Sequence, residues 1–197
     1  NCIPGGYVEH INRVVDIALE LLPTWIKYGG HKDYTTEELV FTCINHDLGK
    51  LGLPGIPGCF LNDNQWEIDK LGKQYKYNTI LPFSTVPDRG LYILQSAGIA
   101  LTQNEFIGIK IHDGLYEEAN KPYLVSYQPD SRLRSNLALV VHQADMIASR
   151  TEWEREWFKG ESVPTKELIP TKEPVSEKPV TAFKASKVEA LKRVINK

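Results

Sequence analysis

The sequence predicts an all-α fold, and three observations lead to it. Apolar residues recur at helical spacing over long stretches, above all in residues 7–22 and 135–158. Thr35 and Thr102 each precede a glutamate by three residues, the capping-box pattern of a helix start. Strand-like alternation of apolar and polar residues is rare. A chain of 197 residues is long enough to bury a sizeable core, so we expect one helical bundle.

The expected helices follow one another with short breaks. The first covers residues 7–22 and ends at Pro23, and the second covers residues 36–48, before a loop rich in glycine and proline. Residues 65–77 fit a short helix or a hairpin equally well. Three more helices are expected, at residues 89–98, 102–112 and 135–158.

The composition changes after Gly160. Prolines interspersed with glutamate and lysine predict an extended linker over residues 159–185. Residues 186–197 form a basic amphipathic pattern, which predicts a tail helix that docks on its own core or on a neighbouring subunit. Contact of its lysines with a membrane or nucleic acid is the alternative. The predicted folded domain therefore spans residues 1–158.

The overall composition limits the kinds of partner. With 23 basic and 25 acidic residues the net charge is −2, so no general positive field favours polymeric nucleic acid. A local cluster of charges can still hold a small nucleotide. No apolar run approaches the roughly 20 residues that span a bilayer, so no membrane partner is expected. Three cysteines without CxxC spacing suggest reduced thiols in a cytoplasmic protein, and a homo-oligomer is compatible with the sequence.

A histidine and an aspartate stand side by side, as His46 and Asp47, after the apolar run 39–44. Imidazole and carboxylate are good ligands for divalent metals, although a capped helix end alone would also explain the pair. His10 and Asp145 are likewise polar residues within apolar helical stretches. Because a buried polar group without a partner is costly, one divalent cation bound by all four would satisfy them together.

In this order, His10…His46-Asp47…Asp145, the residues resemble the H…HD…D pattern of the HD-domain superfamily of metal-dependent phosphohydrolases. The resemblance covers roughly residues 1–158 and includes Gly-Gly-x-x-Glu-His at the first ligand and His-Asp-x-Gly-Lys at the second. It implies an HD-domain-like helical bundle in which the four residues bind a divalent ion. Mn, Fe, Co, Ni, Zn and Mg all suit such a mixed nitrogen and oxygen donor set.

Two departures from that pattern bear on the number of metal ions. Binuclear members of the superfamily resemble this chain but place histidine where Val86 stands, before a Pro-Glu pair. Some members have two adjacent histidines where this chain has His112 and Asp113. A single ion is therefore favoured over two. His112 and Asp113 are expected to contact substrate or to serve as weak ligands of a second ion, and capping of the preceding helix is the alternative.

Phosphoryl transfer also needs positive charge against the phosphate oxygens. Lys50 follows Asp47 in a glycine-flanked loop and is the best-placed cation for catalysis and substrate binding, with a solvated lysine as the alternative. Arg89 is a second candidate for substrate binding. Asp88 is a candidate acid or base, although a simple turn aspartate fits equally well.

Two more side chains are candidates for the surroundings of the site. His142 precedes Asp145 by three residues and so shares its helix face. We expect a core histidine there, with a hydrogen-bond partner of a metal ligand or a fifth ligand as alternatives. Tyr116 belongs to a segment that can form part of a pocket wall.

The function that these expectations favour is hydrolysis of a phosphoester in a small (deoxy)nucleotide by metal-activated water. A cyclic-nucleotide or oligonucleotide phosphodiesterase is the first alternative. A non-catalytic HD domain that binds nucleotide or a partner protein is the second.

Overall fold

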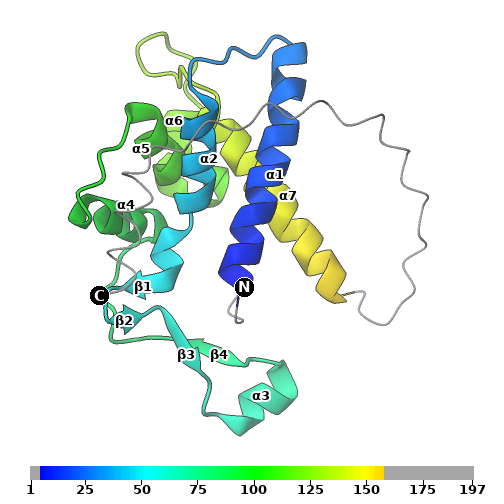
Figure 1. Cartoon of the computed structure of the whole chain (residues 1–197), viewed down its shortest axis with the longest axis vertical. Helices are drawn as coiled ribbons and strands as arrows, with labels where there is room; N and C mark the ends of the chain where they lie inside the picture. The colour runs from blue at the N-terminus through cyan, green and yellow to red at the C-terminus, as the bar shows by residue number, and fades with distance from the viewer. Residues whose placement is uncertain (1–4, 158–197) are drawn as a thin grey trace.

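The protein is mostly helical in a computed structural model, which describes residues 5–157 (Figure 1). This confirms the predicted all-α class. The helices are α1 (Gly6–Lys27), α2 (Thr36–Asn45), α3 (Gln65–Leu71), α4 (Val86–Ser96), α5 (Gln103–Lys110), α6 (Lys121–Leu124) and α7 (Leu137–Trp157). Short 3₁₀ turns cover Leu48–Leu51, Gly114–Tyr116 and Glu118–Asn120.

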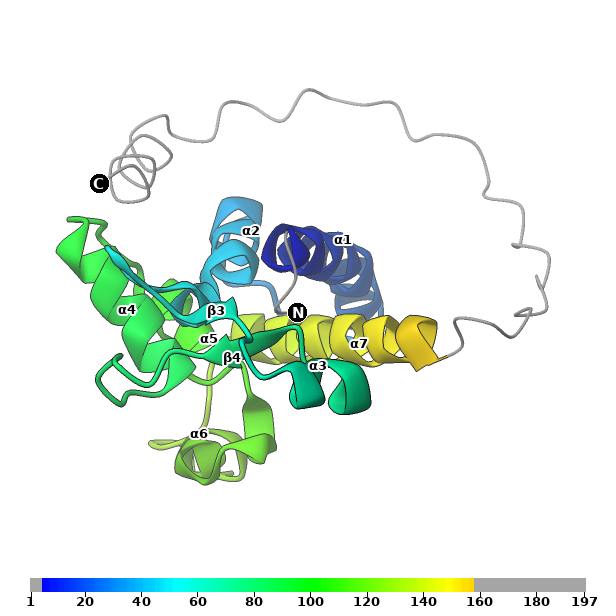
Figure 2. The same cartoon turned by 90° about the horizontal axis from the view of Figure 1, so that it is seen from below.

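Two small antiparallel hairpins interrupt the helices. One pairs β1 (Gly52–Leu53) with β2 (Ile56–Pro57), and the other pairs β3 (Cys59–Leu61) with β4 (Tyr75–Tyr77). The helix α3 connects the two strands of the second hairpin. We call β3, α3 and β4 the arm, because together they project from the end of the molecule at which α1 begins (Figures 1 and 2).

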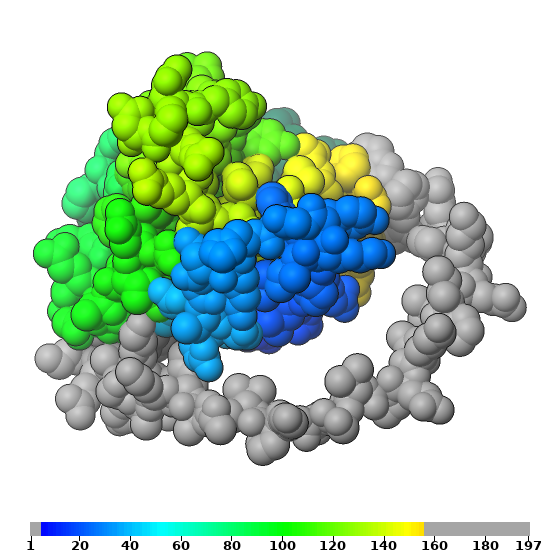
Figure 3. Space-filling model, turned by 90° about the horizontal axis from the view of Figure 1, so that it is seen from above, coloured from blue at the N-terminus to red at the C-terminus, as the bar shows by residue number. Residues whose placement is uncertain are grey.

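The larger core lies between α1, α2 and α7. Both α1 and α2 pack against α7, and in the space-filling view part of α7 lies behind α1 (Figure 3). The side chains buried there come from all three helices and from the loop before α2: Val14, Ala18, Leu22, Tyr34, Leu39, Cys43, Leu137, Val140, Val141, Ala144 and Ala148. Apolar residues at helical spacing therefore face one shared interior.

A second core joins α4 and α5 to the other face of α2. Its buried members are Phe41, Leu48, Ile93, Leu94, Ile99 and Ile109. The 3₁₀ turn after α2 packs tightly on α4, because Gly49 has no side chain. A Cβ atom at this position would lie 2.1 Å from the carbonyl oxygen of Val86. The glycine thus lets the turn that carries the His-Asp pair lie directly on α4.

The prediction that Pro23 ends the first helix is wrong. The helix continues through it to Lys27, since Leu22 is buried and the Trp25 indole donates a hydrogen bond to Gln143 on α7 (3.0 Å). These tertiary contacts stabilise the last turn, although proline has no backbone N–H and one helical hydrogen bond is therefore missing. The helix ends only where Gly29 takes a positive φ of 92°.

Other boundaries shift by a few residues. The second helix ends at Asn45 rather than at 48, and α4 begins at Val86 rather than at 89, because Thr85 caps it. Both predicted capping boxes are present. Residues 65–77 contain both of the structures that the sequence left open, a helix and a hairpin strand. The helical period of residues 135–158 predicts that Trp153 lies on the apolar face of the last helix, but its side chain is 56% exposed.

The predicted linker at 159–185 and tail helix at 186–197 lie outside the described residues. The domain boundary at 158 stays a prediction. Among the helices that the structure describes, none combines the length and apolar character needed to cross a membrane.

Candidate metal centre

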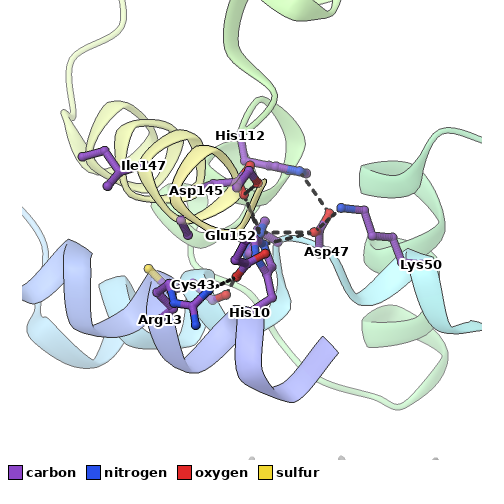
Figure 4. A network of polar contacts seen from close by, with 12 residues as sticks. His10, Arg13, Cys43, Asp47, Lys50, His112, Asp145, Ile147 and Glu152 are labelled. Atoms are coloured by element: carbon purple, nitrogen blue, oxygen red, sulfur yellow. Dashed lines mark hydrogen bonds and ion pairs between the residues drawn. The ribbon is translucent and has the colours of Figure 1, made fainter. Parts of the chain in front are cut away.

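Five potential metal ligands from four parts of the chain meet at the end of the larger core at which α1 begins and α2 ends. His10 comes from α1, His46 and Asp47 from the end of α2, His112 from the turn after α5, and Asp145 from α7 (Figure 4). We call these five residues the cluster. His10, His46, Asp47 and His112 are at most 2% exposed, and the side chain of Asp145 is 18% exposed. The structure thus brings together all four predicted ligands and adds His112.

The break at the end of α2 explains how two adjacent residues reach one centre. His46 still has helical backbone angles, but Asp47 leaves the helix with φ −104° and ψ 11°. Side chains of neighbouring helical residues point about 100° apart, so the break removes this divergence. The Oδ2 atom of Asp47 lies 3.4 Å from the Nε2 atom of His46.

The two carboxylates lie between the three imidazoles. His10 Nε2 is 3.1 Å from Asp145 Oδ1 and 3.5 Å from Asp47 Oδ2. His46 Nε2 is 3.7 Å from Asp145 Oδ1, and His112 Nε2 is 3.5 Å from Asp47 Oδ1. Ligand atoms of His10, His46 and Asp47 lie within 4.8 Å of one another, and so do those of His46, His112 and Asp145. Each of these two groups could hold a metal ion.

All three histidines direct the same ring nitrogen toward the centre. His46 donates from Nδ1 to the carbonyl oxygen of Cys43 (2.7 Å), and His112 donates from Nδ1 to that of Ile109 (2.8 Å). A carbonyl only accepts hydrogen bonds, so Nδ1 carries the proton, and Nε2 of the neutral ring has the lone pair. This tautomer is the one that binds a metal through Nε2.

In the third histidine, His10, the Nδ1 atom contacts a carboxylate instead of a backbone carbonyl oxygen. His10 Nδ1 lies 3.1 Å from Oε1 of Glu152, which is 142 residues away in the sequence, and Arg13 contacts the same oxygen at 2.8 Å. A carboxylate behind a ligating histidine fixes the ring and increases its basicity. Sequence reasoning missed Glu152. Its place seven residues after Asp145, two helical turns along the same face, was the available signal.

The donor set fits a divalent cation on physical grounds. The Nε2 atoms of His10 and His46 are buried, and neither has a hydrogen-bond partner of acceptable geometry within the described part of the chain. Such atoms are costly to bury unless something binds them. The two carboxylates of the cluster together carry a charge of −2, which a divalent ion would balance.

Among the protein groups alone, the crowding of charges shifts several pKa values. Burial disfavours the imidazolium form of His46, but the nearby carboxylates of Asp145 and Asp47 outweigh it and raise its pKa to about 10. Burial would raise the pKa of Asp47, yet His112 and His46 hold it well below its usual range. The pKa of Asp145 is lowered against burial by neighbouring imidazoles in the same way. Both carboxylates are therefore ionised at neutral pH, as metal binding requires.

Lys50 lies beside the cluster. Its Nζ atom pairs with Oδ2 of Asp47, while 54% of its side chain is exposed. Burial lowers the pKa of Lys50, but the charge of Asp47 outweighs this and raises it, so the amine stays protonated. Asp113 also lies beside the cluster, with Oδ1 3.5 Å from His112 Nε2 and a side chain that is 45% exposed.

The two remaining candidates make other contacts. Arg89 donates hydrogen bonds to the carbonyl oxygens of Gly49 (3.1 Å), Pro82 and Ser84 (both 3.3 Å), so its guanidinium holds the loop on α4. Asp88 pairs with Lys110, which lowers the pKa of its carboxyl. Within residues 5–157 these contacts link neither residue to the cluster, and their predicted roles stay predictions.

Comparison with known proteins adds nothing to this geometry: no protein-family model, no curated protein and no solved structure matches the chain.

Proposed function

We propose that the protein hydrolyses a phosphoester of a small (deoxy)nucleotide with the help of one divalent cation. The observation that carries the proposal is the convergence of three buried Nε2 atoms and two ionised carboxylates on one centre, which agrees with the resemblance of the sequence to HD-type phosphohydrolases. His10, His46, Asp47 and Asp145 would hold the ion, with His112 as a further donor. Bound there, the ion would lower the pKa of a water molecule and polarise a phosphoryl oxygen.

The other residues at the site would bind the phosphate and accept protons during the reaction. Lys50 is protonated and half exposed, so its amine can turn outward to a phosphate oxygen while its stem stays beside Asp47. Asp113 is exposed beside His112 and can accept a proton at the surface of the site. Asp88 is a weaker candidate for that role, because Lys110 stabilises its ionised form.

A small substrate fits the charge of the chain better than a polymer does. The net charge is −2, and two of the arginines already have partners: Arg13 pairs with Glu152, and Arg89 donates to backbone carbonyls. Binding of a long polyanion depends on many basic side chains along a track.

The test is phosphate release from a panel of nucleoside mono-, di- and triphosphates with added Mn²⁺, Co²⁺, Ni²⁺ or Mg²⁺. Wild-type protein is expected to show metal-dependent release, and Asp47→Ala is expected to lose it. Asp63→Ala is the matched control, because Asp63 is an exposed aspartate of the arm that pairs with Lys76. Wild-type protein with bound metal that turns over no substrate would rule out the proposal. Cyclic nucleotides are assayed in parallel by the nucleoside monophosphate that their hydrolysis forms. Turnover of these substrates alone would favour the phosphodiesterase alternative.

A further inference from the structure

A groove of about 320 Å³ runs along α7 beside the cluster. One of its walls is a single face of the helix, because each contributing residue has another one three or four positions further along or back. These residues are His142, Asp145, Met146, Ser149, Arg150 and Trp153, and the opposite wall contains Asp113 and Tyr116. Asp145 belongs to both the groove and the cluster, so a molecule in the groove would lie next to the bound ion. The volume lies at the lower end of the range for small-molecule sites.

The two ends of the groove differ in chemistry. At one end the ring of Tyr116 lies 6.2 Å from that of His142, whose Nδ1 donates to the carbonyl oxygen of His112 (2.7 Å). At the other end stand Arg150 and Trp153, both exposed. An indole with a guanidinium beside it offers a flat apolar face and hydrogen-bond donors next to each other.

The distances along α7 decide which end suits a nucleobase. In a nucleotide the sugar separates the base from the phosphate, so the base lies well away from the phosphorus atom. His142 is three residues from Asp145, about 4.5 Å along the helix axis, whereas Trp153 is eight residues away, about 12 Å. By this measure the Trp153 end leaves more room than the His142 end for a sugar between the base and a phosphate held beside Asp145.

Building on the proposed function, we propose that this groove binds the nucleoside part of the substrate. The phosphate lies at the cluster next to Asp145, the sugar along Met146 and Ser149, and the base on the indole of Trp153. Every nucleobase has a π face, so stacking on Trp153 accepts many bases. Arg150 adds a cation and donors at the edge of the base. The inference thus assigns base binding to Trp153 and Arg150.

The experiment measures binding by titration calorimetry with Mn²⁺-loaded protein. The probes are nucleoside phosphonates, whose carbon–phosphorus bond resists hydrolysis, and methylphosphonate, which has neither sugar nor base. Trp153→Ala is expected to weaken nucleoside phosphonate binding by about 5- to 150-fold, the usual effect of losing one stacked base. Its affinity for methylphosphonate should stay within about twofold of the wild-type value, since the phosphonate group lies at the cluster.

Two further variants make the result specific. Trp153→Phe keeps an aromatic face and should recover most of the affinity for nucleoside phosphonates, which a general defect in folding would not allow. Tyr116→Ala removes the aromatic ring at the opposite end and should have the smaller effect. An equal loss for both probes in Trp153→Ala, no loss for either, or a larger loss in Tyr116→Ala would overturn the inference.

The outcomes also separate this inference from the proposed function. Binding through Trp153 without phosphate release from any nucleotide would leave the groove as a nucleoside site and reject the hydrolase. Metal-dependent phosphate release with the same KM in wild-type protein and in Trp153→Ala would support the hydrolase and reject the groove as its nucleoside site.

Discussion

The helical body, by which we mean α1, α2 and α4 to α7, differs from the arm in which kinds of side chain it buries and exposes. In the body, ionisable groups such as His46 and Asp47 are buried at the end of a core, and each has fixed partners. In the arm, large apolar side chains are exposed: Leu61 by 70%, Trp66 by 62% and Tyr77 by 79%. The helix α3 buries none of its residues.

This difference shows what holds each region together. Packing between α1, α2 and α7 fixes the body and holds the buried polar groups in place. Hydrogen bonds hold the arm: Asn62 donates to Glu67 (2.8 Å) and to the carbonyl oxygen of Lys73 (2.9 Å), and Asn64 caps α3. A two-stranded hairpin without a core is only marginally stable in water. The body therefore has the rigidity that a catalytic site needs.

The largest expected effect on stability comes from removing a large side chain from the second core of the body. Phe41 is 2% exposed and packs between α2, α4 and α5. Phe41→Ala should lower the free energy of unfolding by about 3–5 kcal/mol, because it removes buried apolar surface and leaves a cavity. Urea denaturation measures this. A loss below about 1 kcal/mol would show that the core is less tightly packed than the structure has it.

Addition of metal should stabilise the body next most strongly. Mn²⁺ at about 100 times its dissociation constant adds about 2.7 kcal/mol to the free energy of unfolding. For a domain of this size, this corresponds to a rise in Tm of roughly 5–11 °C. Asp47→Ala should show no such rise, while Asp63→Ala in the arm should behave as wild type. If none of several divalent ions changed the Tm of wild-type protein, the cluster would not be a metal site.

Removal of the carboxylate behind His10 should have a smaller, specific effect. Glu152→Ala is expected to weaken metal binding by about 10- to 100-fold, since the imidazole loses the partner that orients it. Glu152→Gln keeps an oxygen that can accept from Nδ1 and should recover part of the affinity. Glu154→Ala is the control, as Glu154 is exposed on the same helix. Calorimetric titration with Mn²⁺ gives the constants, and equal affinity in all three variants would exclude this positioning role.

The smallest effect is expected in the arm. Trp66→Ala removes a larger aromatic ring than Phe41→Ala does, yet Trp66 is 62% exposed. The free energy of unfolding should change by no more than about 0.5 kcal/mol, as for most surface substitutions. The same urea denaturation as for Phe41→Ala tests it. A loss comparable to that of Phe41→Ala would mean that the arm is packed against something in solution, such as a second copy of the chain.

Most of the fold could be predicted from the sequence because its signals are local. Helical periodicity gave α1, α2 and α7, and two capping boxes gave the starts of α2 and α5. The arm could not be predicted, because residues 65–77 have no apolar face whose period would distinguish helix from strand. The end of the first helix was predicted wrongly because a sequence pattern reports only local preference. Proline tends to end a helix, but contacts with α7 outweigh that preference at Pro23.

The sequence by itself determined which side chains are available to the site. His10, His46, Asp47 and Asp145 stand out because each is polar within an apolar helical run, a pattern of neighbouring residues. Only the tertiary structure decided which groups surround them. It placed His112, for which the sequence had left several roles open, among the ligands of the cluster. It also placed Glu152 behind His10 across 142 residues and formed the groove that ends at Trp153. The physical reason is that periodicity reports which face of a helix is buried, whereas the partner across the core depends on how separate helices pack.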